Sequence, residues 1–282
     1  MPDWTVADQR LKRDGGKVDY LESRFIGGAF PKPPTIAVIH FTYGGSGRSS
    51  AEWFRHPGNP GSSAHVVIDR DGTVIQCVPW DRVAWHAGKS RWKGLVGLNS
   101  HSYGIELANW GYLKRNGGNW HCYTGTRIGD PFVATHRNGN PDGGREPIGW
   151  EPYPEGQFDA TVGVVRALVE ALGVTEIVGH EDISPTRKWD PGPAFDMARF
   201  KARVFGERAS DGDNLLRVTG SAGVNLRPEP STAKPAVETL KQGTMLVPLA
   251  TEGRWIEVSV LGQGGEPRAT GWVHGAYVEE VD

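Results

Sequence analysis

Two histidines and one aspartate offer the ligand set of a catalytic metal ion. His40 ends a β-branched run, His180 follows a second short apolar run, and Asp190 comes soon after it. Two imidazoles and a carboxylate leave the fourth position of a tetrahedral Zn²⁺ open to water, as catalytic zinc requires. Spacing alone is weak evidence, because a histidine at a strand end is more often a core residue. The rigid turn Pro191-Gly192-Pro193 favours the metal site, since it can hold Asp190 in place.

A single carboxylate interrupts an otherwise apolar run. Glu106 lies within residues 102–108, a stretch that favours a buried strand. A carboxylate in apolar surroundings beside a metal could act as a general base toward water. Its alternative role is that of a strand-end carboxylate paired with an arginine. The residues alone do not separate these two roles.

Short strands and amphipathic helices must position these side chains. Residues 35–41 form a β-branched run typical of a buried central strand, so His40 stands at a strand exit. Residues 65–76 predict two strands joined at Asp71-Gly72, a strong hairpin signal. Apolar residues share one helical face over 158–172, and Gly173 predicts the helix end. The other expected elements are a short helix from Ser50, strands over 102–108 and 175–178, and a helix over 193–205.

The 282 residues fit one catalytic domain and one small module. Residues 1–34 are polar and irregular, so we expect an N-terminal extension there, followed by the catalytic domain over 35–209. A polar linker, Ser210 to Asn214, comes next. Short alternating runs separated by Gly, Pro and Asn then predict a small all-β barrel, within a second domain over 210–282.

Composition excludes several classes of protein. The 31 basic and 33 acidic residues leave a net charge of -2, which supplies no positive field for nucleic acid. No apolar window approaches the roughly 18 residues of a membrane span, and the first residues lack the basic start and apolar run of a Sec signal. We therefore expect a soluble chain. Cys77 and Cys122 form no disulfide framework, and two buried thiols are favoured over one bridge.

Several short motifs follow one another between Pro34 and Phe205. They are Val38-Ile39-His40, Ser63-Ala64-His65, Asp69-Arg70-Asp71-Gly72, Trp85-His86-Ala87-Gly88, Gly104-Ile105-Glu106-Leu107, Gly179-His180-Glu181-Asp182-Ile183 and the run from Arg187 to Phe195. In this order they resemble the zinc N-acetylmuramoyl-L-alanine amidases, the superfamily of T7-type phage lysins, bacterial muropeptide amidases and peptidoglycan-recognition proteins. The resemblance implies an α/β fold with a mixed central β-sheet flanked by helices.

The same resemblance implies a role for each candidate site residue. His40, His180 and Asp190 would bind Zn²⁺, and Glu106 would carry the proton between water and the departing amine. Lys188 would stabilise the oxyanion, because its side chain points the same way as that of Asp190 two residues later on an extended segment. His86 would contact substrate, with Trp85 stacked beside it. The alternatives are a solvated lysine at 188 and structural roles for His86 and Trp85.

The chain departs from the family pattern in three places. Some relatives carry a tyrosine where Ala64 stands, so His65 is expected behind the site or in the core. The T7 type uses cysteine as the third ligand, and Asp190 therefore groups this chain with the muropeptide amidases. The stretch 109–157, rich in Trp and Tyr, matches no family motif. It is expected either to line a groove for glycan and stem peptide or to form a structural flap.

The C-terminal residues resemble bacterial SH3-like modules. The resemblance rests on Gly223 to Pro228, Gly253 to Val258 and Gly271-Trp272-Val273. Such modules often bind cell-wall peptide or glycan, which the resemblance implies here. The alternative is an accessory domain that only packs on the catalytic one.

The sequence thus predicts a Zn²⁺-dependent hydrolase of the bond between N-acetylmuramic acid and L-alanine in peptidoglycan or muropeptides. Such an enzyme would act on the cell wall in the periplasm or outside the cell after release or export, and otherwise in the cytoplasm. The same residues are compatible with two alternatives. One is a peptidoglycan-recognition protein without catalysis, and the other is a metallopeptidase that cuts the stem peptide.

Overall fold

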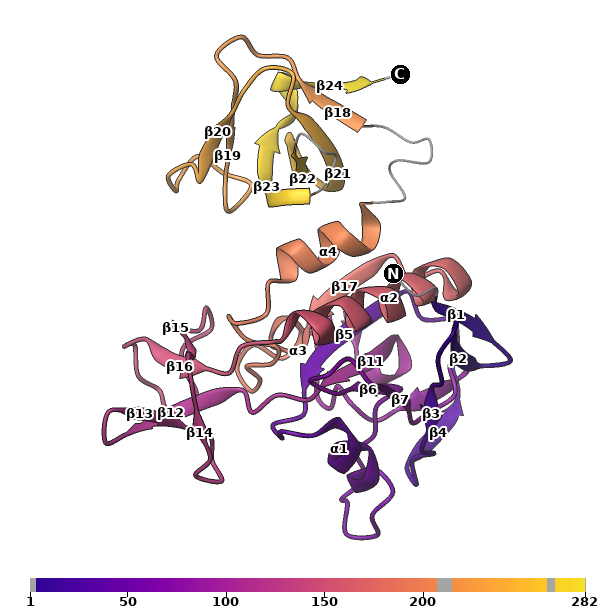
Figure 1. The fold of residues 1–282 in the computed structure, drawn as a ribbon. Coiled ribbons are helices and arrows are strands. Elements are labelled where there is room, and N and C mark those ends of the chain that lie inside the picture. The colour runs from indigo at the N-terminus through magenta and orange to yellow at the C-terminus, as the bar shows by residue number, and fades with distance from the viewer. Residues whose placement is uncertain (1–3, 207–214, 263–266, 282) are drawn as a thin grey trace. The chain divides into compact units, whose positions relative to one another are not determined.

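A computed structural model describes residues 4–206, 215–262 and 267–281. The chain forms two compact units, Met1–Phe195 and Asp196–Asp282 (Figure 1). Their boundary lies earlier than the expected one at residue 209, because the helix before the linker belongs with the second unit. In the part of the chain that is described, no helix has both the length and the apolar character needed to cross a membrane.

A six-stranded mixed sheet forms the centre of the first unit. Its order is β17 (Glu176–Gly179), β5 (Ile36–Phe41), β11 (Ser102–Leu107), β6 (Val66–Ile68), β7 (Val74–Gln76) and β3 (Asp19–Tyr20). The first four strands run parallel, and β7 turns back antiparallel through the predicted hairpin. The predictions of an α/β fold and of a mixed sheet are confirmed.

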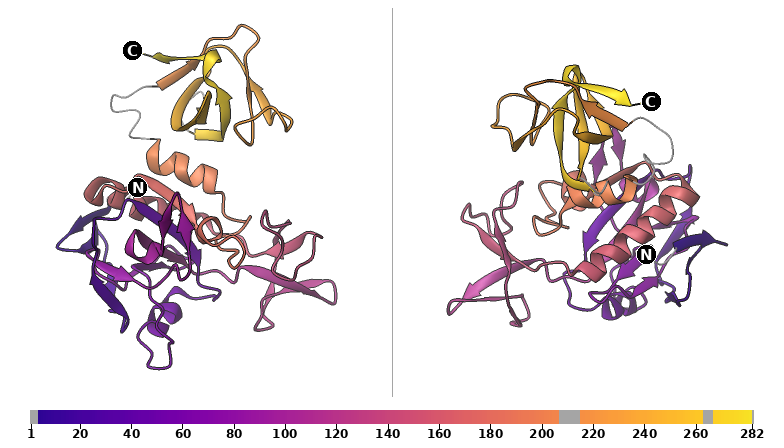
Figure 2. Two further views of the ribbon diagram at one scale, coloured as in Figure 1. Left: turned by 180° about the vertical axis from the view of Figure 1, so that it is seen from behind. Right: turned by 45° about the horizontal axis from the view of Figure 1, so that its top comes forward.

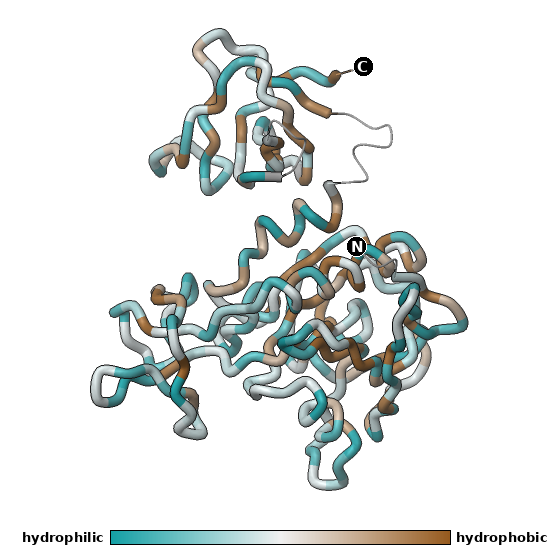
Figure 3. The backbone as a smooth tube through the Cα atoms, in the orientation of Figure 1, coloured by the Kyte–Doolittle hydropathy of each residue, from teal (hydrophilic) through white to brown (hydrophobic). Residues whose placement is uncertain are grey.

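Helices cover both faces of this sheet, which is why most residues of its central strands are apolar. Ile36 to Ile39 of β5 are buried, and the central strands colour as hydrophobic in Figure 3. Helix α2 (Glu155–Leu172) lies across one face, where its Gln157 amide donates to the carbonyls of Ile68 and Ala108 (Figure 2). Helix α1 (Gly47–Trp53) covers the other face with Ala51. Cys77 and Cys122 are buried free thiols, as predicted.

The N-terminal segment is not the irregular extension that its composition indicates. Strands β1 (Trp4–Ala7) and β2 (Arg10–Arg13) form a hairpin, β3 adds to the central sheet, and β4 (Ile26–Ala29) pairs with β8 (Arg82–Ala84). The buried Trp4 ring occupies the space beside Gly163 of α2, where an added Cβ would lie 2.3 Å from it. These strands of two to four residues are too short to show a hydrophobic period.

Residues 109–151, hereafter the insert, form a five-stranded antiparallel sheet rather than a loop. Its order is β14 (Arg127–Ile128), β13 (Asn119–His121), β12 (Tyr112–Asn116), β16 (Ile148–Trp150) and β15 (Phe132–Ala134). Figure 1 shows the insert extending away from the central sheet. The buried Glu151 carboxylate connects the two ends of the insert, because it accepts a hydrogen bond from Trp110 N–H at 2.6 Å. It also pairs with Arg70 at 3.2 Å.

The loops of the first unit carry four further short elements. These are β9 (Arg91–Trp92), β10 (Leu95–Val96), the 3₁₀ turn Leu98–Ser100 and helix α3 (His180–Ile183).

Among its described residues, the second unit consists of β-strands, one helix and a 3₁₀ turn, Gly275–Tyr277. Helix α4 (Met197–Phe205) begins four residues later than predicted, because the Asp196 side chain caps it by accepting from Arg199 N–H. An antiparallel sheet has the order β23 (Pro267–His274), β22 (Trp255–Leu261), β21 (Met245–Glu252), β18 (Leu215–Val218) and β24 (Val278–Val281). A separate hairpin joins β19 (Val224–Leu226) to β20 (Glu238–Leu240).

Candidate metal centre

Three parallel strands bring the candidate site residues to one edge of the central sheet. Residues His40 and Glu106 are register partners on β5 and β11. On the other side of β5, Gly179 ends β17 opposite Ile39, and His180 follows directly as the first residue of α3. Because parallel strands end at the same edge, residues far apart in the chain meet there.

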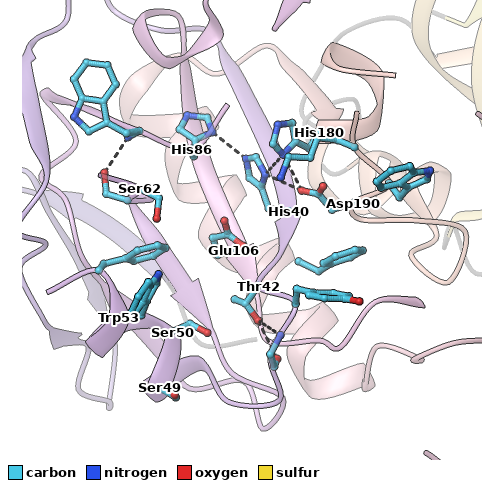
Figure 4. Close-up of a pocket in the computed structure, with 18 of the residues that line it drawn as sticks. His40, Thr42, Ser49, Ser50, Trp53, Ser62, His86, Glu106, His180 and Asp190 are labelled. Carbon is cyan, nitrogen blue, oxygen red and sulfur yellow. Dashed lines mark hydrogen bonds and ion pairs between the residues drawn. The ribbon is translucent and has the colours of Figure 1, made fainter. Parts of the chain in front are cut away.

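The three predicted ligand side chains lie in mutual contact. The Nδ1 atoms of His40 and His180 are 2.9 Å apart, and the Oδ2 atom of Asp190 lies 3.0 Å and 2.9 Å from them (Figure 4). All three residues are buried, and their ligand atoms could share one ion. The arrangement has the nitrogen and oxygen donors that zinc takes in open, three-ligand sites.

The outer nitrogens of both imidazoles are bound to protein groups. His180 Nε2 lies 3.1 Å from the Ala87 carbonyl, which can only accept, so the ring proton sits on Nε2 and the Nδ1 lone pair faces Asp190. His40 Nε2 lies 2.9 Å from His86 Nδ1. Such outer contacts fix the tautomer and the orientation of metal-binding imidazoles.

Burial and charge shift the pKa values of His40 and Asp190 in the directions that favour binding of a cation. Burial, together with the neighbouring His180, lowers the pKa of His40 to about 4, so its imidazole is neutral near pH 7. Burial disfavours ionisation of Asp190, but the two imidazoles beside it outweigh that effect and hold its pKa well below the ordinary value. A neutral imidazole at His40 and an ionised carboxylate at Asp190 are the forms in which these side chains bind Zn²⁺.

Glu106 lies beside the three ligands with one carboxylate oxygen unused. Its Oε2 is enclosed and accepts no hydrogen bond from the described residues, and no arginine among them pairs with it. Burial, followed by the charge of Asp190, raises the pKa of Glu106 to about 8, and Lys188 opposes that rise. Glu106 and Lys188 line the same cavity of about 660 Å³ as the three ligands.

His86 and Trp85 both line the cavity. His86 is buried, and its ring contacts those of His40 and His65. It fits there because residue 104 is glycine: a Cβ at Gly104 would lie 2.4 Å from the His86 ring. Trp85 is 45% exposed and lines the cavity.

His65 lies in the core, as expected. Its ring stacks on Trp80 at 5.5 Å, its Nδ1 accepts from Gly104 N–H and its Nε2 donates to the Arg82 carbonyl. Burial lowers its pKa to about 3.

Three tyrosines that sequence reasoning did not single out as a group form an aromatic wall of the cavity: Tyr43, Tyr112 and Tyr123. Tyr43 stacks on Tyr123 with ring centroids 4.8 Å apart and lies 5.1 Å from Tyr112. Burial and a hydrogen bond with Tyr112 raise the pKa of Tyr43 well above its usual value. Tyr43 follows β5 with a left-handed backbone, φ 55°. Figure 4 shows Trp53 and Ser62 across Glu106 from Asp190, at the other end of the cavity.

Comparisons with known proteins agree with this architecture. The family model described as N-acetylmuramoyl-L-alanine amidase, Amidase_2, matches residues 30–193. The 1,6-anhydro-N-acetylmuramyl-L-alanine amidase AmpD of Escherichia coli is 35% identical over 147 residues, 51% of this chain and 60% of AmpD. The N-acetylmuramoyl-L-alanine amidase AmiD of the same organism is 30% identical over 47% of this chain and 38% of AmiD.

Among solved structures, a selenomethionine AmpD derivative has 26% identity and a TM-score of 0.49, covering 71% of this chain and 98% of that one. This chain spans about 60% of the length of the curated AmpD that it matches. The family model itself covers more than half of the chain and every residue of the candidate metal centre. The chain therefore belongs to the Amidase_2 family of N-acetylmuramoyl-L-alanine amidases.

Proposed function

We propose that this protein is a Zn²⁺-dependent hydrolase of the amide bond between the lactyl group of N-acetylmuramic acid and L-alanine. The observation that carries the proposal is the contact of His40 Nδ1, His180 Nδ1 and Asp190 Oδ2 beside an unpaired Glu106 carboxyl oxygen. Membership of the Amidase_2 family supports the choice of bond.

Each residue around the site has a separate role in the proposed reaction. His40, His180 and Asp190 would hold Zn²⁺, which would polarise the amide carbonyl, acidify the attacking water and favour the ionised form of Glu106. Glu106 then accepts the proton of the water and returns it to the departing amine nitrogen. The Lys188 ammonium stabilises the negative charge that develops on the carbonyl oxygen. His86 and the Ala87 carbonyl hold the two imidazoles in position.

We propose a muropeptide or the intact wall as the substrate, because aromatic side chains line the cavity that holds the metal centre. They are the three tyrosines of the aromatic wall together with Trp53 and Trp85. Flat, partly exposed rings pack well against the carbon faces of sugars and against apolar stem-peptide groups. AmpD is named for 1,6-anhydro-N-acetylmuramyl-L-alanine, which makes the soluble anhydro-muropeptide a substrate to compare with whole sacculi.

The second unit is proposed to be an SH3-like module that binds cell-wall peptide or glycan. Its short antiparallel strands enclose one small apolar core, with Leu226, Leu246 and Val258 at its centre. A module of this kind would hold the enzyme on an insoluble wall and leave hydrolysis of soluble fragments unaffected.

Metal analysis coupled to product identification tests the proposal. Purified full-length protein is expected to bind about one Zn²⁺, and treated muropeptide is expected to yield a free L-alanine amine and an intact sugar. Glu106→Gln should keep the metal and lose turnover. Metal binding without any product would indicate a recognition protein, and cleavage within the stem peptide, seen by mass spectrometry, would indicate a peptidase. Normal turnover by the zinc-loaded E106Q variant would refute the mechanism.

A further inference from the structure

One loop of the insert contacts the chain segment that carries two of the three ligands. The loop is residues 136–139, between β15 and β16, and the segment is residues 179–192, which includes His180 and Asp190. The mechanism above uses none of the loop residues, and the family motifs do not include them. The contacts of this loop therefore point to a role outside the chemical steps.

A buried carboxylate lies at the centre of these contacts. Glu181 is 8% exposed, and its Oε2 accepts from His136 Nε2 at 2.6 Å and from the Gly192 N–H at 3.1 Å. Its Oε1 pairs with Arg137 at 2.7 Å. A buried carboxylate is costly unless donors surround it, so the three donors hold Glu181 at one place.

His136 is oriented to donate to Glu181. It is 2% exposed, and its Nδ1 accepts from the backbone N–H of Asn138 at 3.0 Å. An imidazole nitrogen that accepts carries no proton, so the proton is on Nε2, which faces Glu181. The Asn140 side chain in turn accepts from His136 N–H, which fixes the loop around the ring.

Further bonds tie the same two segments on either side of this pair. Asn138 Nδ2 donates to the Glu181 carbonyl at 3.0 Å, and Arg137 also pairs with Asp182. Trp189, next to Asp190, donates its indole N–H to the Gly139 carbonyl at 3.0 Å. Within the ligand segment, Glu181 N–H donates to the Asp190 carbonyl at 2.8 Å, so Glu181 contacts both the loop and a ligand residue.

We propose that His136, Arg137, Asn138 and Gly139 form a clasp that positions His180 and Asp190 for metal binding. The ligand segment has little structure of its own, because α3 spans only four residues and such a short helix is not stable alone. Ligands must be held to within about 0.5 Å for a metal site to work. The clasp supplies that constraint through Glu181. This inference rests on the proposed zinc site.

A matched pair of substitutions at His136 tests the clasp. Glutamine can place its amide nitrogen near the position of Nε2, whereas asparagine reaches only the position of Nδ1. We expect His136→Asn to weaken Zn²⁺ binding by about tenfold, the effect typical of lost outer contacts to a metal site. It should also change the visible absorption of the Co²⁺-loaded protein, which reports ligand geometry. His136→Gln should restore both properties toward the wild type.

Because a substitution at a buried residue can prevent folding, two substitutions at exposed arginines provide a second test in the full-length chain. Arg137→Gln removes the ion pairs to Glu181 and Asp182, while Arg145→Gln makes the same charge change elsewhere on the insert. Weaker metal binding and an altered Co²⁺ spectrum in R137Q, but not in R145Q, would support the clasp.

The remaining outcomes separate the clasp from the proposed function. If the wild type binds Zn²⁺ while folded H136N and R137Q bind it equally well with unchanged Co²⁺ spectra, the clasp is refuted and the zinc site stands. If the wild type itself binds neither ion, the proposed function and the clasp fail together.

Discussion

Burial favours the neutral form of the Glu106 carboxyl group. Burial and then Asp190 raise its pKa from 4.5 to about 8. The folded protein therefore binds this proton more tightly than the unfolded chain does. Stability contributed by the neutral group is complete below pH 4.5 and is lost as the pH rises toward about 8.

We predict that Glu106→Gln makes the metal-free protein more stable than the wild type above pH 8, by on the order of a few kcal/mol, because ionising the buried carboxyl group costs free energy that the neutral amide avoids. The gain should vanish as the pH falls toward 4.5. Thermal unfolding in chelator across this range measures it. Glu170→Gln, an exposed change on α2, serves as control. A constant difference at every pH would contradict the assignment.

At the scale of elements, β11 requires glycine at position 104, because the His86 ring packs against the strand there. A methyl group at Gly104 would meet the His86 ring at 2.4 Å, and His86 in turn contacts His40. We predict that Gly104→Ala destabilises the protein by about 1–3 kcal/mol through overpacking and lowers its affinity for zinc. Denaturant unfolding and metal titration test this, with Gly129→Ala, which meets open space, as control. Unchanged affinity for zinc would show that His86 does not position His40.

The insert contributes Tyr123 to the cavity, where it is 58% exposed and stacked on Tyr43. If the aromatic wall contacts substrate, Tyr123→Ala should raise KM by roughly threefold to tenfold, because one aromatic contact is worth about 1 kcal/mol. Its kcat should change less. Phe132→Ala removes a ring of the insert that is 47% exposed and does not line the cavity. Equal kinetics for the two variants would exclude the wall from substrate binding.

Elements with a strong local signal were predictable from the sequence, and those that depend on distant partners were not. The strand before His40, the turn at Asp71-Gly72 and the apolar face of α2 each carry their pattern within one stretch of chain. Strands β1 to β4 and the insert are short, and their pairing partners lie elsewhere, so composition indicated irregular chain.

The same contrast holds within the site. His40, His180 and Asp190 each stand in a recognisable motif, and the structure brings all three together. Contacts between positions that share no motif were not predictable. His136 and Glu181 are in contact although they lie 45 residues apart in the chain. No sequence pattern indicates the positive φ of Tyr43. The contact between His86 and His40 likewise joins two motifs that lie far apart in the chain, so no pattern in the sequence indicates it.

At the scale of the whole molecule, every residue of the metal centre belongs to the first unit. We predict that residues 1–195 alone bind zinc and hydrolyse soluble muropeptide at the rate of the full chain. Their activity on sacculi should fall, because the proposed wall-binding module is missing. Turnover of both substrates by the two proteins, with sedimentation of protein on sacculi, measures the difference. An equal loss on both substrates would instead assign the second unit a role in catalysis.

The pairing of Glu106 with His40 across two hydrogen-bonded strands has a consequence for how this scaffold can be altered. Their separation is a property of sheet spacing, about 4.8 Å between neighbouring strands, and is independent of any loop. The insert departs only two residues beyond β11, yet it leaves that pairing untouched. Surrounding loops can thus be exchanged while His40 and Glu106 keep their distance, which makes this edge of the sheet a suitable place for grafting new specificity.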